Sequence, residues 1–127
     1  MYQILVCDDD KEIVEAIRIY LSGEGYQVIS AYNGREALEA VHKETPHLAV
    51  LDIMMPRMDG ISATLKIREK SNVPLIFLSA KSEDTDKIAG LTFGGDDYVT
   101  KPFNPLELCA RVKSQIRRYV ALGSIEE

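Results

Sequence analysis

The sequence predicts a doubly wound α/β fold, in which a five-stranded parallel sheet carries helices on both faces. Two observations lead to this prediction. Short apolar segments alternate along the chain with longer segments in which apolar residues recur at helical spacing. The short segments are mostly apolar throughout, as is typical of strands that are buried on both faces of a parallel sheet.

Each predicted strand is a short apolar run, and residues that start or stop helices bound the segments between them. The predicted strands are Ile4–Cys7, Tyr26–Ala31, Leu48–Leu51, Leu75–Leu78 and Tyr98–Thr100. The predicted helices are 11–22, a helix that opens at Asn33-Gly34 and exits at Pro46, 61–69, 82–93 and a last helix from Pro105. Gly23 stops the first helix, and proline suits the first turn of the last one. With right-handed crossovers, we expect a flavodoxin-like strand order, 2-1-3-4-5.

The composition describes one acidic globular domain. The chain has 127 residues, enough for one hydrophobic core, and a net charge of −5. An acidic domain repels DNA phosphates and anionic membranes, so direct binding to either is not expected. Cys7 and Cys109 lie in apolar segments without neighbours at metal-ligand spacing, which favours a reduced, intracellular protein. We expect the domain to span residues 1–122 and residues 123–127 to form a tail or the start of a linker.

Side chains with ionisable or hydroxyl groups collect where the predicted strands end. In an open parallel sheet, ligands bind outside the carboxyl ends of the strands. The side chains found there are Asp8, Asp9, Asp52, Ser79 and Lys101. We therefore expect three carboxylates, a hydroxyl and an ammonium group in one shallow pocket. The neighbouring Asp10 is better placed to cap the first helix.

This set of groups suits the transfer of a phosphoryl group to a carboxylate. Crowded carboxylates attract a hard divalent cation; Mg²⁺ fits best because it also binds phosphate oxygens, and Mn²⁺ or Ca²⁺ could substitute. A carboxylate can act as the nucleophile, and the transfer mainly needs positioning and charge neutralisation. Asp52 is the expected nucleophile because the central strand holds it rigidly. Lys101 would neutralise charge, and the Ser79 hydroxyl would donate to a phosphate oxygen.

Several stretches of the chain resemble receiver domains of two-component response regulators. They are Ile4–Asp10, Leu51–Pro56 with Met58-Asp59-Gly60, Leu78–Lys81 and Asp96–Phe103. The resemblance covers essentially the whole chain, from residue 1 to about residue 119. The stretches Gly94–Phe103, Pro105–Leu108 and Ala110–Val112 are similar to the OmpR/PhoB subfamily, and Gln115–Tyr119 is similar to its VanR-like members.

The resemblance implies a metal and phosphate site. Asp52 matches the phosphoacceptor, and Asp9 matches the direct Mg²⁺ ligand. Asp8 matches the acid that holds the metal through water, and the backbone carbonyl of Met54 matches the third protein ligand.

The resemblance also implies a conformational switch. Ser79 matches the switch hydroxyl, Lys101 the phosphate-binding lysine and Tyr98 the aromatic side chain that changes rotamer on activation. Pro102 matches a position that often follows a cis peptide bond.

The implied function is a phosphorylation-dependent signalling switch. Such a domain accepts a phosphoryl group from a sensor histidine kinase in the cytoplasm, catalyses only its own phosphorylation and slow dephosphorylation, and controls transcription. Members of the subfamily contact DNA through a C-terminal winged-helix domain, which this sequence does not contain. Either the protein works alone, or the chain is the receiver portion of a longer regulator; we favour the latter because the sequence ends a few residues after the last helix.

The resemblance further suggests that phosphorylation drives symmetric dimerisation through the fourth helix, fifth strand and last helix. A two-fold axis would pair Lys87 with Glu107, and Asp97 with Arg111, between the two chains. The expected face comprises Lys87, Ile88, Leu91, Asp96, Asp97, Glu107, Ala110, Arg111 and Arg118.

Three alternative functions fit the sequence less well. A phosphatase of the haloacid-dehalogenase type needs a second aspartate two residues after its nucleophile, where this chain has Met54. A flavodoxin-like nucleotide-binding module needs a glycine-rich phosphate loop after the first strand, where this chain has aspartates. A degenerate receiver that binds partners without phosphorylation would not need all five site residues.

Overall fold

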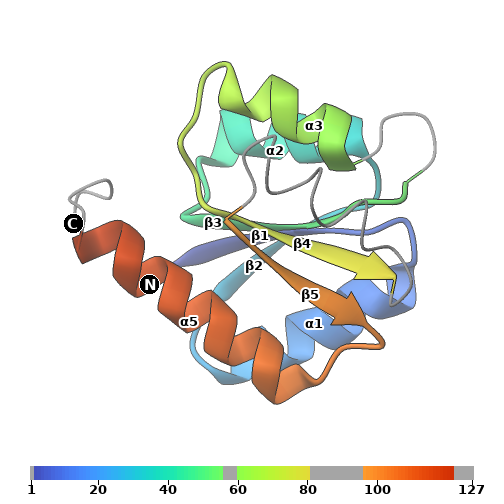
Figure 1. Ribbon diagram of the computed structural model, residues 1–127, viewed down its shortest axis with the longest axis vertical. Helices are drawn as coiled ribbons and strands as arrows, with labels where there is room; N and C mark the ends of the chain where they lie inside the picture. Colours follow the sequence, from blue (N-terminus) through green and yellow to red (C-terminus); the bar gives the residue numbers. More distant parts are fainter. Residues whose placement is uncertain (1, 56–59, 81–95, 122–127) are drawn as a thin grey trace.

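The computed structural model describes residues 2–55, 60–80 and 96–121. These residues contain one parallel sheet of strand order β2-β1-β3-β4-β5, which confirms the predicted topology (Figure 1). The strands are β1 (Gln3–Cys7), β2 (Gln27–Ala31), β3 (Leu48–Asp52), β4 (Leu75–Ala80) and β5 (Asp97–Lys101). The helices are α1 (Lys11–Gly23), α2 (Gly34–Glu44), α3 (Gly60–Arg68) and α5 (Pro105–Ala121).

The sheet separates two layers of helices. Helices α1 and α5 cover one face, and α2 and α3 cover the other (Figure 1). Successive side chains of β1 enter opposite layers: Ile4 and Val6 pack with α1 and α5, whereas Leu5 and Cys7 pack with α2. Strands β1 and β3 are therefore buried on both faces, and polar side chains can gather only at the ends of these strands.

Local capping interactions shape the turns at the carboxyl edge of the sheet. Asp10 caps α1 as predicted, because its side chain accepts hydrogen bonds from the backbone N–H groups of Glu12 and Ile13. Asn33 caps α2 in the same way by accepting from the N–H of Glu36 at 2.8 Å. The first of these turns directly follows β1, whose end carries Asp8, and the second follows β2.

Strands β4 and β5 are longer than the sequence predicted. Their pairing continues through Ser79 with Thr100 to Ala80 with Lys101, so Ser79 and Lys101 lie within paired strands rather than after them. The apolar pattern missed these residues because it stops at the polar side chains of Ser79 and Lys101, whereas the backbone pairing continues past them. The predicted helix 82–93 lies outside the described residues. None of the described helices has the length and apolar character that crossing a lipid bilayer requires.

A polar network ties the start of β4 to the start of β5. The Asp96 carboxylate accepts a hydrogen bond from the backbone N–H of Leu75 at 2.8 Å and lies 3.2 Å from the Arg68 guanidinium. Arg68 also donates to the carbonyl oxygen of Val73 at 2.6 Å. Asp96 was expected on the dimer face; within the chain, its carboxylate accepts from the first N–H of β4 and pairs with the last residue of α3.

We predict that replacing Asp96→Ala lowers the free energy of unfolding by about 1–3 kcal/mol, because it leaves the partly buried Leu75 N–H without its acceptor. Asp96→Asn retains an acceptor oxygen and should lose less than about 1 kcal/mol, the usual worth of a partly exposed ion pair. Urea unfolding measures both. Glu39→Ala, which removes the exposed i,i+4 pair with Arg35, is the control; equal losses for all three variants would contradict the assignment.

Candidate functional site

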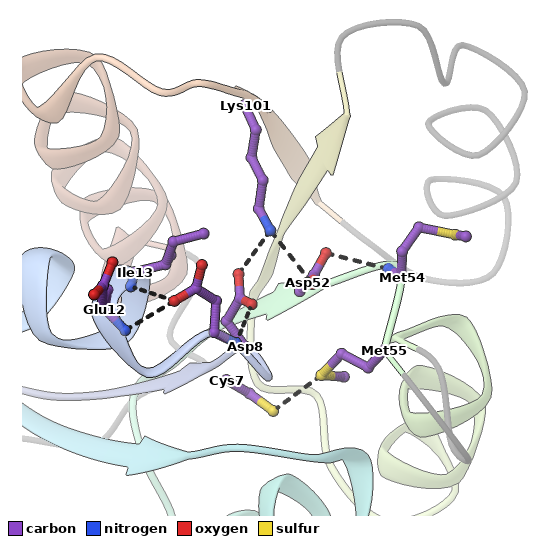
Figure 2. Close-up of polar contacts among 9 residues, drawn as sticks. Cys7, Asp8, Glu12, Ile13, Asp52, Met54, Met55 and Lys101 are labelled. Carbon is purple, nitrogen blue, oxygen red and sulfur yellow. Dashed lines mark hydrogen bonds and ion pairs between the residues drawn. The ribbon is translucent and has the colours of Figure 1, made fainter.

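The parallel strands deliver the expected side chains to one edge of the sheet. Asp52 is the last residue of β3, Asp8 directly follows β1, and Lys101 ends β5. In Figure 2 the Lys101 side chain reaches across this edge toward Asp8 and Asp52. Asp9 lies beside Asp8 but is exposed. The structure therefore brings the four charged residues of the predicted pocket together.

An ion-pair bridge holds the two buried carboxylates. The Lys101 Nζ atom lies 2.8 Å from Oδ2 of Asp8 and 3.4 Å from Oδ2 of Asp52. The Asp8 side chain is fully buried, and that of Asp52 is 5% exposed. The contact between Lys101 and Oδ2 of Asp8 is short and charge-assisted, and it contributes to the raised pKa of Lys101. A single cation thus compensates two nearly buried anions.

Backbone N–H groups orient the other oxygen of each acid. Oδ1 of Asp8 accepts from the N–H of Asp10 at 2.9 Å, and Oδ1 of Asp52 accepts from the N–H of Met54 at 3.1 Å. Each carboxylate is therefore held at one oxygen by the backbone and at the other by Lys101. This arrangement leaves little rotational freedom to Asp52.

The donor set fits a hard divalent cation. Asp8, Asp9 and Asp52 can each offer one carboxylate oxygen, and these atoms lie within 4.8 Å of one another. Three carboxylate oxygens lie at one edge, two of them on nearly buried residues. This number suits Mg²⁺, which takes a few protein oxygens as ligands and keeps several waters in its remaining coordination positions. Met54, whose backbone carbonyl is the other expected ligand, follows Asp52 by two residues, and its side chain is exposed.

The electrostatics of the site favour a proton or a cation on Asp52. Burial and the nearby charge of Asp8 raise the pKa of Asp52 to about 6, although Lys101 and the N–H of Met54 act in the opposite direction. Burial opposes the charge on Lys101, but its contacts with Asp8 and Asp52 outweigh this effect, and its pKa is raised. Lys101 alone therefore does not fully neutralise the cluster.

Ser79 supplies a buried hydroxyl on β4, one residue beyond Leu78, the register partner of Asp52. It is 1% exposed, and its Oγ has no hydrogen-bond partner among the described residues. The next strand places Thr100 beside it, while Tyr98 pairs in register with Phe77. Tyr98 is partly buried and lines a cavity of about 350 Å³ that also borders Lys101. The peptide bond between Lys101 and Pro102 is cis, as the resemblance implied.

A buried thiol beneath the carboxylates was not singled out by the sequence as part of the site. Cys7 Sγ donates to the carbonyl oxygen of Asn33 at 3.3 Å and lies 3.5 Å from Sδ of Met55 (Figure 2). Burial, with the charges of Asp8 and Asp52, raises the pKa of Cys7 to about 12, so it stays a thiol. Its place directly before Asp8 in a buried strand was the available signal. Cys7 thus links β1 to the segment after β3.

One of the ion pairs expected between two chains of a dimer is found within a single chain. Arg111 Nη1 binds both carboxylate oxygens of Asp97 in the same chain, at 2.8 and 2.9 Å. The pair expected between two chains is therefore already formed within one, because β5 and α5 place both residues on one surface. Glu107, Ala110 and Arg118 are exposed on α5 as expected. Lys87, Ile88 and Leu91 lie outside the described residues.

Comparison with known protein families gives one match that covers most of the chain. The model of the response regulator receiver domain matches residues 4–113. The regulatory protein VanR of Enterococcus faecium is 48% identical over 125 residues, which cover 98% of this chain and 54% of VanR. VanRc of Enterococcus gallinarum is 50% identical over 117 residues, which cover 92% of this chain and 51% of VanRc. The chain spans about half the length of these relatives.

Solved structures agree with this match. The receiver domain of a Francisella response regulator aligns with a TM-score of 0.87 and 39% identity, covering 93% of this chain and 98% of that one. A two-component response regulator from Clostridium difficile aligns with a TM-score of 0.88 and 32% identity over the same shares of the two chains.

The raised pKa of Asp52 makes a prediction about metal-free stability. A carboxyl whose pKa rises from 3.8 to about 6 on folding destabilises the folded state above pH 6, and this penalty disappears as the pH falls toward 4. Asp52→Asn should therefore raise the free energy of unfolding at pH 7.5 by about 1–3 kcal/mol in the presence of EDTA.

Urea unfolding at pH 7.5 and pH 4 measures this effect. The gain should be present at the higher pH and small at the lower one. A variant as stable as the wild type at pH 7.5, or a gain independent of pH, would show that the buried charge carries no such penalty.

Proposed function

Because the chain belongs to the response regulator receiver domain family, we propose that it is a phosphorylation-dependent switch that accepts a phosphoryl group on Asp52 from a sensor histidine kinase. The observation that carries this proposal is the arrangement at the carboxyl edge of the sheet. One nearly buried carboxylate, Asp52, lies against a lysine, beside two further acids and near a buried hydroxyl with no partner among the described residues. The domain acts in signalling and is not a typical enzyme.

The acids provide the cation site. Asp8, Asp9 and Asp52 would hold Mg²⁺ together with the backbone carbonyl of Met54. The bound ion supplies charge neutralisation for the carboxylates and for the incoming phosphate oxygens. The excess negative charge that raises the pKa of Asp52 is the physical reason for the cation to bind.

The transfer step needs Asp52 as an ionised nucleophile. A carboxylate oxygen of Asp52 attacks the phosphorus of a phosphohistidine on the kinase. The new O–P bond forms as the P–N bond breaks, and the imidazole leaves with the electron pair of that bond. The hydrogen bond from the N–H of Met54 and the contact with Lys101 orient the carboxylate for this attack.

The conformational response would follow from the negative charge that phosphorylation adds at Asp52. A phosphoryl group on Asp52 adds negative charge, and Lys101 would turn from Asp8 toward the phosphate oxygens. The Ser79 hydroxyl would donate to the same group. Tyr98, on the neighbouring strand, would move inward as Ser79 shifts. The site would thus convert a covalent change into a change of the surface formed by β5 and α5.

Two phosphorylated copies would then associate through the surface formed by the predicted helix 82–93, β5 and α5. Because Nη1 of Arg111 already binds Asp97 within the chain and its Nε atom is buried, any further carboxylate from the partner would bind its Nη2 atom. We propose that a longer form of the protein contacts DNA through a winged-helix domain and acts in the cytoplasm. VanR and VanRc, which are about twice as long as this chain, are named as regulatory proteins.

Incubation with acetyl phosphate and Mg²⁺ should add the mass of one phosphoryl group to the wild type and none to Asp52→Asn. Intact-mass spectrometry measures the uptake. Asp10→Asn is the matched control, because asparagine also caps helices and Asp10 lies outside the cation site. A label on Asp52→Asn, or one that maps elsewhere in the wild type, would refute the assignment of the phosphoacceptor.

Ser79→Ala should still be phosphorylated but should lose the response of Tyr98. Without the hydroxyl, no hydrogen bond from this position can reach the phosphate. Amide NMR spectra of the phosphorylated variant should keep about the unphosphorylated shifts around Tyr98, whereas Ser79→Thr should respond as the wild type does. Full responses in both variants would mean that the hydroxyl does not couple the two residues.

Activation with beryllofluoride should produce a dimer, and Ala110→Asp should prevent it. The exposed Ala110 lies at the centre of the proposed face, where a buried unpaired carboxylate would weaken association by about tenfold or more. Sedimentation velocity measures the dimer. Gln27→Glu adds the same charge at an exposed position of β2, the edge strand opposite β5, and should dimerise normally. A monomeric activated wild type would contradict the proposal.

A further inference from the structure

A groove lies at the edge of the sheet opposite the carboxylate site. It is lined by Tyr2, Tyr26, Lys113, Ile116, Arg117 and Val120, and its volume is about 440 Å³. Tyr2 and Tyr26 immediately precede β1 and β2, so this is the amino edge of the strands. The groove therefore does not overlap with the site of Asp52, which lies at the carboxyl edge.

The groove has an apolar floor. Tyr2, Tyr26 and Val120 are partly buried and pack against the core on the side of α1 and α5, and Ile116 is 4% exposed. The aromatic ring of Tyr2 is held edge-on to His47, with ring centroids 5.1 Å apart. The apolar surface is thus built on side chains that the fold already holds in place.

One wall of the groove is cationic. Lys113 and Arg117 are exposed and lie one helical turn apart on α5. Neither forms an ion pair with a carboxylate among the residues that the structure describes, in contrast to Arg111 on the same helix. Two cations without an ion-pair partner among the described residues thus stand beside an apolar floor, on a chain with a net charge of −5. An acidic ligand would be attracted here and repelled by most of the remaining surface.

The charged residues of the lining all come from one side of the groove. Lys113 and Arg117 both lie on α5, and the other lining residues carry no formal charge. A ligand with carboxylates on one side would therefore bind in one orientation, with its acids toward α5.

We propose that this groove docks an acidic polypeptide segment of a protein partner, with apolar side chains on the floor and carboxylates on Lys113 and Arg117. The segment is amphipathic: its apolar side chains contact Tyr2, Tyr26 and Val120. Because the groove and the site of Asp52 are at opposite edges, the segment binds without phosphorylation and leaves the phosphoacceptor accessible.

The test uses the unphosphorylated 127-residue chain, so it does not depend on the proposed switch. The probe is an acetylated, amidated peptide of sequence Glu-Glu-Leu-Leu-Glu-Glu, titrated into the labelled protein and followed by amide NMR. We expect saturable shifts centred on the residues around Tyr26 and Ile116. A peptide with serine in place of both leucines should bind about tenfold more weakly or worse, because it lacks the apolar contacts.

A pair of adjacent variants separates a specific contact from net charge. Arg117→Glu should weaken binding of the peptide by about tenfold, whereas Arg118→Glu, which changes the net charge equally but does not line the groove, should change it by less than about twofold. Equal losses in the two variants, or shifts that map elsewhere, would overturn the proposal. So would a single-stranded oligonucleotide that shifts the same residues when the peptide does not, since that would assign the cations to nucleic acid.

Discussion

The structure depends on how a buried cluster of negative charge is compensated. Asp8 and Asp52 are nearly inaccessible to water, and the ammonium group of Lys101 is the one cation within ion-pair distance of them among the described residues. Burying a charge is tolerated when it is paired and hydrogen-bonded. Here the pairing is incomplete, as the pKa of about 6 for Asp52 shows. The site is thus poised to gain from any additional positive charge.

The fold supplies this arrangement through its parallel strands. All five strands end at one edge, where β1, β3 and β5 carry the charged site residues, and the apolar layers on both faces prevent water from reaching the carboxylates from the sides. The same burial holds the Ser79 hydroxyl near the site without a partner within the described residues. A phosphoryl group would supply that hydroxyl with an acceptor and draw Lys101 away from Asp8. The incompletely compensated charge of the unphosphorylated site, together with the Ser79 hydroxyl, is therefore what drives the proposed response.

Charged side chains are arranged differently at the opposite, amino edge of the sheet. There, Asp96 and Arg68 form hydrogen bonds with backbone groups at the start of β4, and they form a partly exposed ion pair with each other. Beyond them, the cations Lys113 and Arg117 face an apolar groove. Charges at the carboxyl edge are crowded and buried, whereas those at the amino edge are paired or open to a partner. The proposed phosphorylation site and the proposed docking groove therefore lie at opposite edges of the sheet.

The sequence by itself determined the fold class and most of the site. Continuous apolar runs such as Leu48–Leu51 are typical of strands buried on both faces, and a parallel sheet places the residues at their carboxyl ends along one edge. Asp8, Asp52 and Lys101 were predictable for this reason. Tertiary structure decided what periodicity does not encode: which oxygen meets which cation, and that Arg111 binds Asp97 of its own chain. Such choices depend on rotamers and distances between segments far apart in the sequence, and these are set only when the layers pack.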